Sequence, residues 1–190
     1  MKLLKDRIRK DGTVLPGGVL KVDSFLNHQI DTQLLYECGA KWYESFKDAG
    51  VTKIVTIEAS GIGLACLAAY HFHVPVVFAK KAKTNTPDDS FYSTKVVSYT
   101  HGHEYNVIIA KKCLSKNDKI LILDDLLVNG SAMKALIALC KKSGAEIVGC
   151  GAAIEKIYCG GGNSIRDMGY KVDSLAKISS ISENGDIEFC

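Results

Sequence analysis

Two adjacent carboxylates and a short loop of small residues stand out in the stretch ILILDDLLVNGSAMKAL, residues 120–136. Asp124 and Asp125 follow an apolar run that is typical of a buried strand. Residues 128–132, Val-Asn-Gly-Ser-Ala, then lead into a helical pattern. Backbone N–H groups at the start of a helix favour an anion, and a glycine lets a phosphate approach the backbone closely. The loop is therefore a candidate phosphate site.

The acidic pair suits a different kind of group. Carboxylates accept hydrogen bonds from hydroxyls or bind a divalent cation, whereas they repel a bare phosphate. A phosphate on the loop and a diol on the aspartates together describe a ribose phosphate. The simpler alternative is a turn that begins at Asp124-Asp125 and ends at Asn129-Gly130, but the whole unit of strand, acidic pair, loop and helix favours a site. No GxxxxGK[ST] sequence is present, so the loop is not a P-loop.

Strands and helices alternate along most of the chain, which predicts an α/β protein with a mainly parallel central sheet flanked by helices. The predicted strands of this sheet are 53–59, 74–80, 120–123 and 146–156, and the predicted helices are 31–49, 60–72 and 131–143. The runs 96–102 and 105–112 predict a hairpin, and 170–178 and 186–189 predict edge strands. A short helix ending near Gly12 and a turn at Pro16-Gly17-Gly18 precede this alternation.

Ligands of open α/β sheets bind at the carboxyl ends of the strands. Polar or small residues follow three predicted strands there, at 58–61, 124–125 and 155–156. Lys156 could donate to a carbonyl oxygen of a base, although a lysine after a strand can also simply extend into solvent. Asn27 carries both a donor and an acceptor, which suits the edge of a base, but alone it is more often a loop residue.

The strand, acidic pair and loop resemble the 5-phosphoribosyl-1-pyrophosphate (PRPP) motif of type I phosphoribosyltransferases. Four further segments carry the resemblance across nearly the whole chain: 20–31, 53–62, 74–81 and 152–156. Asn129 stands where most members have threonine, a variant that is similar to the xanthine-specific branch of the family. The resemblance implies the type I fold over residues 1–190 as a single domain, with a small N-terminal hood at about 1–36 and a PRPP-binding core at about 37–190.

The resemblance also implies roles for individual residues. It assigns the acidic pair to the ribose hydroxyls, as the catalytic residues Asp124 and Asp125. It assigns two segments to PRPP, namely Val128, Asn129, Gly130, Ser131 and Ala132 for the 5′-phosphate and Ala59, Ser60 and Gly61 for the pyrophosphate. It assigns Leu20, Asn27 and Lys156 to the xanthine base, and the polar stretch 80–94 to a mobile loop. Mg²⁺ is expected as part of the PRPP complex, with no direct protein ligand.

The implied reaction is the salvage of xanthine with PRPP to give xanthosine 5′-monophosphate and pyrophosphate. Transfer to guanine, hypoxanthine or adenine is the alternative among enzymes, and a non-catalytic PRPP-sensing regulator is the alternative from another class. Val128 stands where the hypoxanthine–guanine relatives carry an aspartate that assists at the purine. Xanthine is more acidic than those bases and needs less help from a general base.

Length, composition and net charge limit the kinds of partner that the sequence predicts. The chain has 190 residues, 47% apolar and 24% charged, and a net charge of +3, too small to indicate a nucleic-acid binder. The N-terminus 1–12 is charged and has no apolar signal region, and no stretch is long enough to span a membrane. The seven cysteines have no metal or disulfide spacing and are expected to be mostly buried thiols, with Cys159 exposed. The five histidines are interpreted as structural or surface residues. A cytoplasmic protein is expected, and a homodimer by resemblance.

Overall fold

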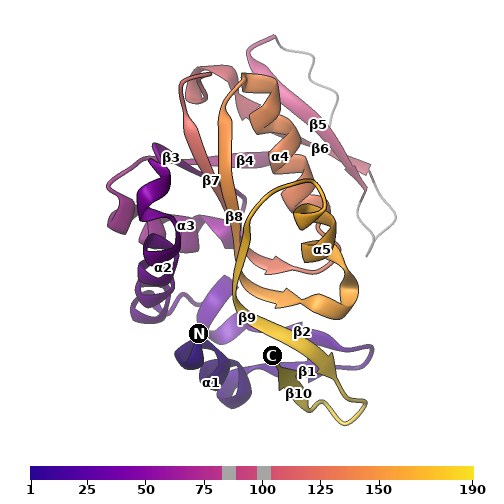
Figure 1. Ribbon diagram of the computed structural model, residues 1–190. Coiled ribbons are helices and arrows are strands. Elements are labelled where there is room, and N and C mark those ends of the chain that lie inside the picture. The colour runs from indigo at the N-terminus through magenta and orange to yellow at the C-terminus, as the bar shows by residue number, and fades with distance from the viewer. Residues whose placement is uncertain (83–88, 98–103) are drawn as a thin grey trace.

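A twisted central sheet with helices on both faces dominates the computed structural model, which describes residues 1–82, 89–97 and 104–190 (Figure 1). The α-helices are α1 (Lys2–Asp11), α2 (Thr32–Phe46), α3 (Ser60–Phe72), α4 (Ser131–Ser143) and α5 (Gly161–Arg166). The sheet contains β3 (Lys53–Ile57), β4 (Val76–Ala82), β5 (Phe91–Val97), β6 (Glu104–Ala110), β7 (Lys119–Leu127), β8 (Glu146–Lys156), β9 (Val172–Ile181) and β10 (Ile187–Phe189).

The strand order confirms the predicted sheet. Within the described ranges the order is β10-β9-β8-β7-β3-β4-β6-β5. The five central strands from β9 to β4 run parallel, and β10, β6 and β5 add antiparallel pairs at the two sides. Buried side chains form one cluster on the side of α2 and α3 and a second on the side of α4. Both faces are therefore covered, which explains why the central strands read as continuous apolar runs.

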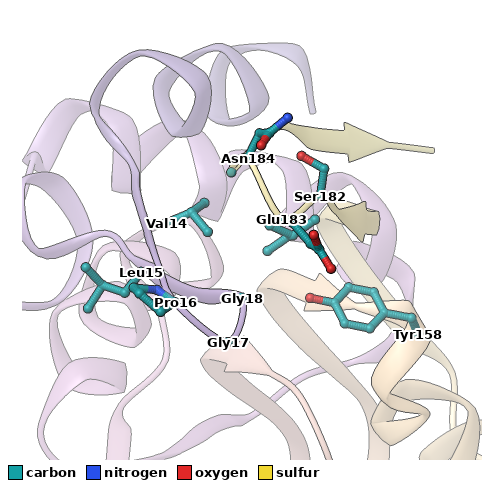
Figure 2. A pocket seen from close by; sticks show the side chains of 11 residues that line it. Val14, Leu15, Pro16, Gly17, Gly18, Tyr158, Ser182, Glu183 and Asn184 are labelled. Carbon is teal, nitrogen blue, oxygen red and sulfur yellow. The ribbon is translucent and has the colours of Figure 1, made fainter.

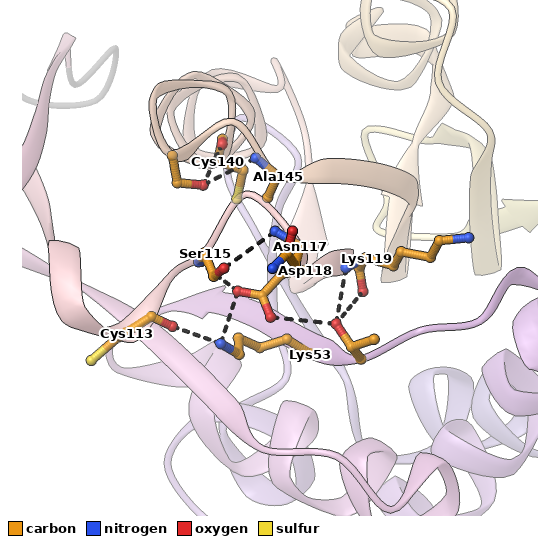
Figure 3. A network of polar contacts seen from close by, with 10 residues as sticks. Lys53, Cys113, Ser115, Asn117, Asp118, Lys119, Cys140 and Ala145 are labelled. Carbon is orange, nitrogen blue, oxygen red and sulfur yellow. Dashed lines mark hydrogen bonds and ion pairs between the residues drawn. The ribbon is translucent and has the colours of Figure 1, made fainter.

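A polar network fixes the amino ends of β3 and β7 side by side (Figure 3). The ammonium of Lys53 donates to the Asp118 carboxylate and to the Cys113 carbonyl oxygen, each at 2.9 Å. The hydroxyl of Thr52 accepts from the Lys119 backbone N–H at 2.9 Å. These contacts set the register in which Lys53 lies beside Ile120. The same register determines which residues meet at the opposite, carboxyl end of the two strands.

The N-terminal segment forms a small unit at one end of the sheet. After α1, strands β1 (Thr13–Leu15) and β2 (Val19–Lys21) form a hairpin whose turn uses the left-handed conformations of Gly17 and Gly18. A π-helical turn, η1 (Asp23–Asn27), follows and leads to α2. Buried residues of this unit, including Leu4, Ile8 and Phe25, belong to the same apolar cluster as α2 and α3.

Asp31 caps α2 at its amino end, as its position before the helical pattern predicts. One carboxylate oxygen accepts from the backbone N–H of Leu34 at 3.0 Å, and the other pairs with the guanidinium of Arg7 at 2.5 Å. We expect Asp31→Ala to lower the free energy of unfolding by about 1 kcal/mol. A thermal melt should then show a decrease in Tm of roughly 2–4 °C. The exposed Asp6→Ala is the control and should shift Tm by less; equal shifts would contradict the cap.

Several expectations from the sequence need correction. Strand β9 is interior, between β8 and β10, so of the two strands predicted to be at an edge only β10 is there. The loop expected at 80–94 is shorter, because β4 continues to Ala82 and β5 begins at Phe91; residues 83–88 lie outside the described ranges, as do positions 98–102 of the predicted hairpin. Strands β5 and β6 do pair in antiparallel fashion.

The cysteines are all free, but most of them are not buried. Cys38, Cys140 and Cys150 are buried, Cys113 is partly exposed, and Cys66, Cys159 and Cys190 are exposed. Cys66 lies in an apolar run but points away from the face of α3 that buries Leu64, Ala65, Ala68 and Ala69. Helical geometry, and not local hydrophobicity, decides its exposure.

Candidate active site

The acidic pair lies in the part of β7 that extends beyond the neighbouring strand β3. Pairing of β7 with β3 ends at Val55 and Ile122, whereas pairing with β8 continues to Leu127. Asp124 and Asp125 therefore lie within β7 and not directly after it, as the sequence had suggested. On the vacated side, the chain leaves β3 through Glu58 and enters α3 at Ser60. Because β7 extends past β3, the acidic pair lies at the carboxyl ends of the strands, beside the segment that joins β3 to α3.

The segment expected to meet pyrophosphate packs directly against the acidic pair. The peptide between Glu58 and Ala59 is cis, and Ala59 is the N-cap of α3. A β-carbon on Gly61 would lie 2.1 Å from the Thr56 hydroxyl oxygen and 3.6 Å from a carboxylate oxygen of Asp124. Because the Thr56 side chain leaves no room for a β-carbon at position 61, the start of α3 packs on β3 more closely than any other residue type would allow, and it lies in contact range of Asp124.

The carboxyl groups of the pair are largely removed from water. Asp124 is 4% and Asp125 7% exposed, and Asp124 accepts a hydrogen bond from the Asp125 backbone N–H at 3.0 Å. Burial, and next the charge of Asp125, raise the pKa of Asp124 well above its ordinary value. The charge of Lys81 opposes this rise. Hydroxyl donors or a cation brought by a ligand would favour the charged form.

We expect Asp124→Asn to raise the stability of the ligand-free protein. A raised pKa means that the folded protein keeps a proton that the unfolded chain loses near pH 4, so the free energy of unfolding falls as pH rises through that range. Asparagine removes this penalty. At pH 7 we expect a gain in Tm of roughly 2–4 °C per kcal/mol recovered, and no gain at pH 3.5. Melts across this pH range check it, and an equal or lower Tm at pH 7 would contradict it.

The predicted phosphate loop has the expected backbone and one feature that was not expected. Gly130 adopts φ +78° and is the N-cap of α4, which begins at Ser131. The side-chain oxygen of Asn129 accepts from the backbone N–H of Ser131 at 3.0 Å and from its hydroxyl. The N–H of Ser131, expected to be unpaired, thus has an internal partner. An anion arriving at the loop has to compete with the Asn129 side chain for this donor.

The expected base-pocket residues come from both parts of the chain. Lys156 ends β8, is 7% exposed, and donates from its ammonium to the Gly18 carbonyl oxygen at 2.7 Å. This bond joins the core to the turn of the β1–β2 hairpin. Leu20 is buried in β2. The amide oxygen of Asn27 is buried and, among the described residues, has no hydrogen-bond partner.

The N-terminal unit also reaches the start of α3. The side chain of Ile30 lies 2.5 Å from the position that a β-carbon of Gly63 would take, so the chain just after η1 packs on the first turn of α3. Four contacts thereby link the predicted segments: 59–61 with 124, 127 with 155, 156 with 18, and Ile30 with the first turn of α3. They meet around one end of the sheet.

A cavity of about 640 Å³ lies beside this region and not within it (Figure 2). It lies between the Pro16–Gly18 turn, Tyr158, and the turn 182–185 between β9 and β10. None of the predicted site residues lines it. We assign the candidate site to the carboxyl ends of the central strands, because the titratable and anion-binding groups are there.

The sequence interpretation missed the roles of two groups near the acidic pair, Lys81 and Tyr105. The backbone N–H of Lys81 donates to the Glu58 carboxylate at 2.7 Å, and the charge of Lys81 acts on Asp124. Burial, and secondarily the charge of Asp124, raise the pKa of Tyr105 in β6. The two lysines at 80–81, directly after an apolar strand, were a usable signal; they had been assigned to the mobile loop. Tyr105 left no such signal.

Within residues 1–82, 89–97 and 104–190, no three His, Cys, Asp or Glu side chains gather in a way that would hold a metal ion. No helix among the same residues is long and apolar enough to cross a membrane.

Comparisons with known proteins agree with one another. Residues 22–175 match the family model described as the phosphoribosyl transferase domain. Over the whole chain, the sequence is 53% identical to the xanthine phosphoribosyltransferase of Bifidobacterium adolescentis, of which the alignment covers 99%. It is 51% identical to the protein of the same name from Lachnoclostridium phytofermentans, of which 98% is covered.

Solved structures share the fold at low sequence identity. The adenine phosphoribosyltransferase of Giardia lamblia in complex with 9-deazaadenine superposes with a TM-score of 0.76 at 17% identity, covering 92% of this chain and 97% of that one. The enzyme of Trypanosoma brucei with AMP, pyrophosphate and ribose-5-phosphate gives 0.77 at 16%, covering 92% and 79%. From the family model, the full-length relatives and the shared fold, we conclude that this chain belongs to the phosphoribosyltransferase family.

Proposed function

We propose that the protein transfers the phosphoribosyl group of PRPP to xanthine, giving xanthosine 5′-monophosphate and pyrophosphate. The observation that carries this proposal is that three features lie together at the carboxyl ends of β7 and β8. They are a buried carboxylate pair, a glycine loop at a helix start, and a nearly buried lysine. The names of the relatives that are 51–53% identical over the full chain favour xanthine as the base.

PRPP is proposed to span the two loops. The 5′-phosphate binds the backbone of 128–132 at the start of α4, where the helix dipole favours an anion. The ribose hydroxyls donate to Asp124 and Asp125, which replaces the water that these carboxyls have lost. The pyrophosphate lies on Ala59, Ser60 and Gly61 at the start of α3, with the charge of Lys81 nearby. Mg²⁺ is expected to arrive with PRPP, where it neutralises pyrophosphate charge.

The reaction needs no covalent nucleophile in this arrangement. The bond from C1 of the ribose to the pyrophosphate oxygen breaks and the electron pair leaves with pyrophosphate. Positive charge develops on the sugar ring, and the carboxylates of Asp124 and Asp125 are placed to stabilise it. A ring nitrogen of the base then bonds to C1. Position 128 is valine, so no carboxylate there takes a proton from the base, which suits a base that enters as an anion.

The base is proposed to bind between Lys156, Leu20 and Asn27. One hydrogen of the Lys156 ammonium is on Gly18, which leaves two for a purine carbonyl oxygen. The buried amide oxygen of Asn27 needs a donor, and an N–H group of the base would supply one. Leu20 contributes apolar surface against the ring.

Oxopurines other than xanthine are the second candidate, because Lys156 would donate equally well to the carbonyl oxygen of hypoxanthine or guanine. The test is pyrophosphate release with PRPP and each of xanthine, guanine, hypoxanthine and adenine in turn. Xanthine should give the highest kcat/KM and adenine the lowest. Binding of PRPP without release for any base would instead support a regulator.

Three further expectations belong to the same proposal. Residues 1–36 act as the hood and 37–190 as the core of one domain. A homodimer is expected, and sedimentation would test it; the exposed aromatic side chains of Tyr36, Tyr43 and Tyr70 on α2 and α3 favour an interface there. Seven free cysteines suit a reducing compartment such as the cytoplasm. Neither a nucleic-acid nor a membrane partner is proposed.

A further inference from the structure

An ion pair with a fully buried carboxylate and a partly exposed guanidinium lies directly behind the phosphate loop. Glu155 of β8 is 0% exposed and lies beside Leu127, the last residue of β7 before the loop begins. The guanidinium of Arg166, at the end of α5, donates to both carboxylate oxygens of Glu155 at 2.8 Å. Burial alone would raise the pKa of Glu155, but the hydrogen bonds and charge of Arg166 lower it. The carboxylate is therefore charged, and the two-pronged contact fixes Arg166.

Two glycines transmit the position of this pair to the loop. A β-carbon on Gly162 would lie 1.7 Å from a carboxylate oxygen of Glu155. A β-carbon on Gly161 would lie 2.3 Å from the Val128 carbonyl oxygen and 2.6 Å from the Gly130 nitrogen. The ion pair, the glycine backbone and the loop are thus packed one on another with no space for a methyl group between them.

Hydrogen bonds reinforce the packing. The backbone N–H of Gly161 donates to the Val128 carbonyl oxygen at 3.0 Å. The hydroxyl of Ser164 donates to the Gly161 carbonyl oxygen at 2.7 Å. The first bond joins Gly161 to the loop, and the second fixes the Gly161 peptide within the segment 161–164.

We propose that Glu155 and Arg166 are positioning residues for PRPP: through Gly161 and Gly162 they hold the backbone of 128–130 in the conformation that binds the 5′-phosphate. Neither side chain contacts the substrate. The inference rests on the proposed function for the identity of the anion. Its distinguishing claim is that the pair acts on PRPP affinity and not only on stability.

The test compares two ion pairs at opposite ends of the sheet, each partly shielded from water. Arg166→Met leaves Glu155 without its partner at the site end, and Lys53→Met leaves Asp118 without its partner at the opposite end. Both variants should lose stability. Only Arg166→Met should raise the KM for PRPP, by about tenfold or more, with a smaller change in kcat and in the KM for the base. Hydrogen exchange at 128–132 should become faster in that variant alone.

Two milder variants keep the test decisive if Arg166→Met does not fold. Arg166→Lys retains the charge and should restore part of the PRPP affinity. Gly161→Ala leaves the ion pair intact but pushes a methyl group toward Val128, and should weaken PRPP binding as strongly as Arg166→Met. Calorimetry with magnesium–PRPP and no base measures each. If the parent binds PRPP and the folded variants bind it equally well, the inference is wrong; if the parent does not bind PRPP, the proposed function is wrong instead.

Discussion

Gly130→Val should lower the affinity for magnesium–PRPP by about 100-fold, or about 2.7 kcal/mol, in a protein that still folds. Gly130 has φ +78°, and its β-carbon would meet the Gly161 carbonyl oxygen at 3.1 Å and the Gly161 Cα at 3.3 Å. Valine adds two methyl groups beyond that crowded β-carbon and also disfavours a positive φ. The loop has to shift, and the phosphate loses backbone donors whose positions depend on it.

A control variant at a second glycine with a positive φ distinguishes the loss of the phosphate site from the cost of backbone strain. Gly169 has φ +89° and nothing within 4 Å of its β-carbon position. Gly169→Val carries a similar conformational cost without a collision, so its Tm should fall while PRPP affinity stays at the parental value. Calorimetry and a thermal melt on both variants check this. Unchanged PRPP affinity in folded Gly130→Val would remove the loop from the phosphate site.

The elements around this loop could be predicted because their signals are local. The apolar run 146–156 became β8 over its whole length, and the helix beginning at Ser131 ends at Gly144 in the left-handed conformation, as its C-terminal glycine indicates. Asp31 caps α2 for the same reason. In each case the residues that decide the structure lie within a few positions of it.

Other features depend on contacts between distant parts of the chain and left no local signal. The extension of β7 to Leu127 requires β8 as a partner after β3 has ended. The bond from Lys156 to Gly18 joins residues 138 positions apart. Glu155 followed an apolar strand, yet nothing nearby in sequence showed that Arg166 would neutralise it or that Gly161 would press on Val128. Local patterns predict which residues approach the sheet edge, but not what supports them there.

The contact between Lys156 and Gly18 sharpens the expectation for base choice. The ammonium has three hydrogens and no acceptor. With one hydrogen on Gly18, the other two can only donate, and burial, which lowers the pKa of Lys156, makes an unpaired donor costly. A purine with a carbonyl at C6 satisfies it, whereas the amino group of adenine presents a second donor. A buried unsatisfied group costs about 1–3 kcal/mol, which corresponds to roughly tenfold discrimination or more.

Lys156→Gln should therefore lose much of the preference for oxopurines over adenine, because an amide can turn either its N–H₂ or its oxygen toward the base. The measurement is kcat/KM for xanthine, guanine and adenine in the parent and the variant. Lys171→Gln is the matched control, since Lys171 also donates to a backbone carbonyl oxygen, that of Ser45 at 2.7 Å, but lies at the amino end of β9; its ranking of the bases should equal that of the parent. If the parent used adenine as well as xanthine, or if Lys156→Gln kept the parental ranking and rates, a group other than Lys156 would read the 6-position. Discrimination between xanthine and guanine, which differ at the 2-position, should persist in Lys156→Gln, because Lys156 is proposed to contact the 6-position.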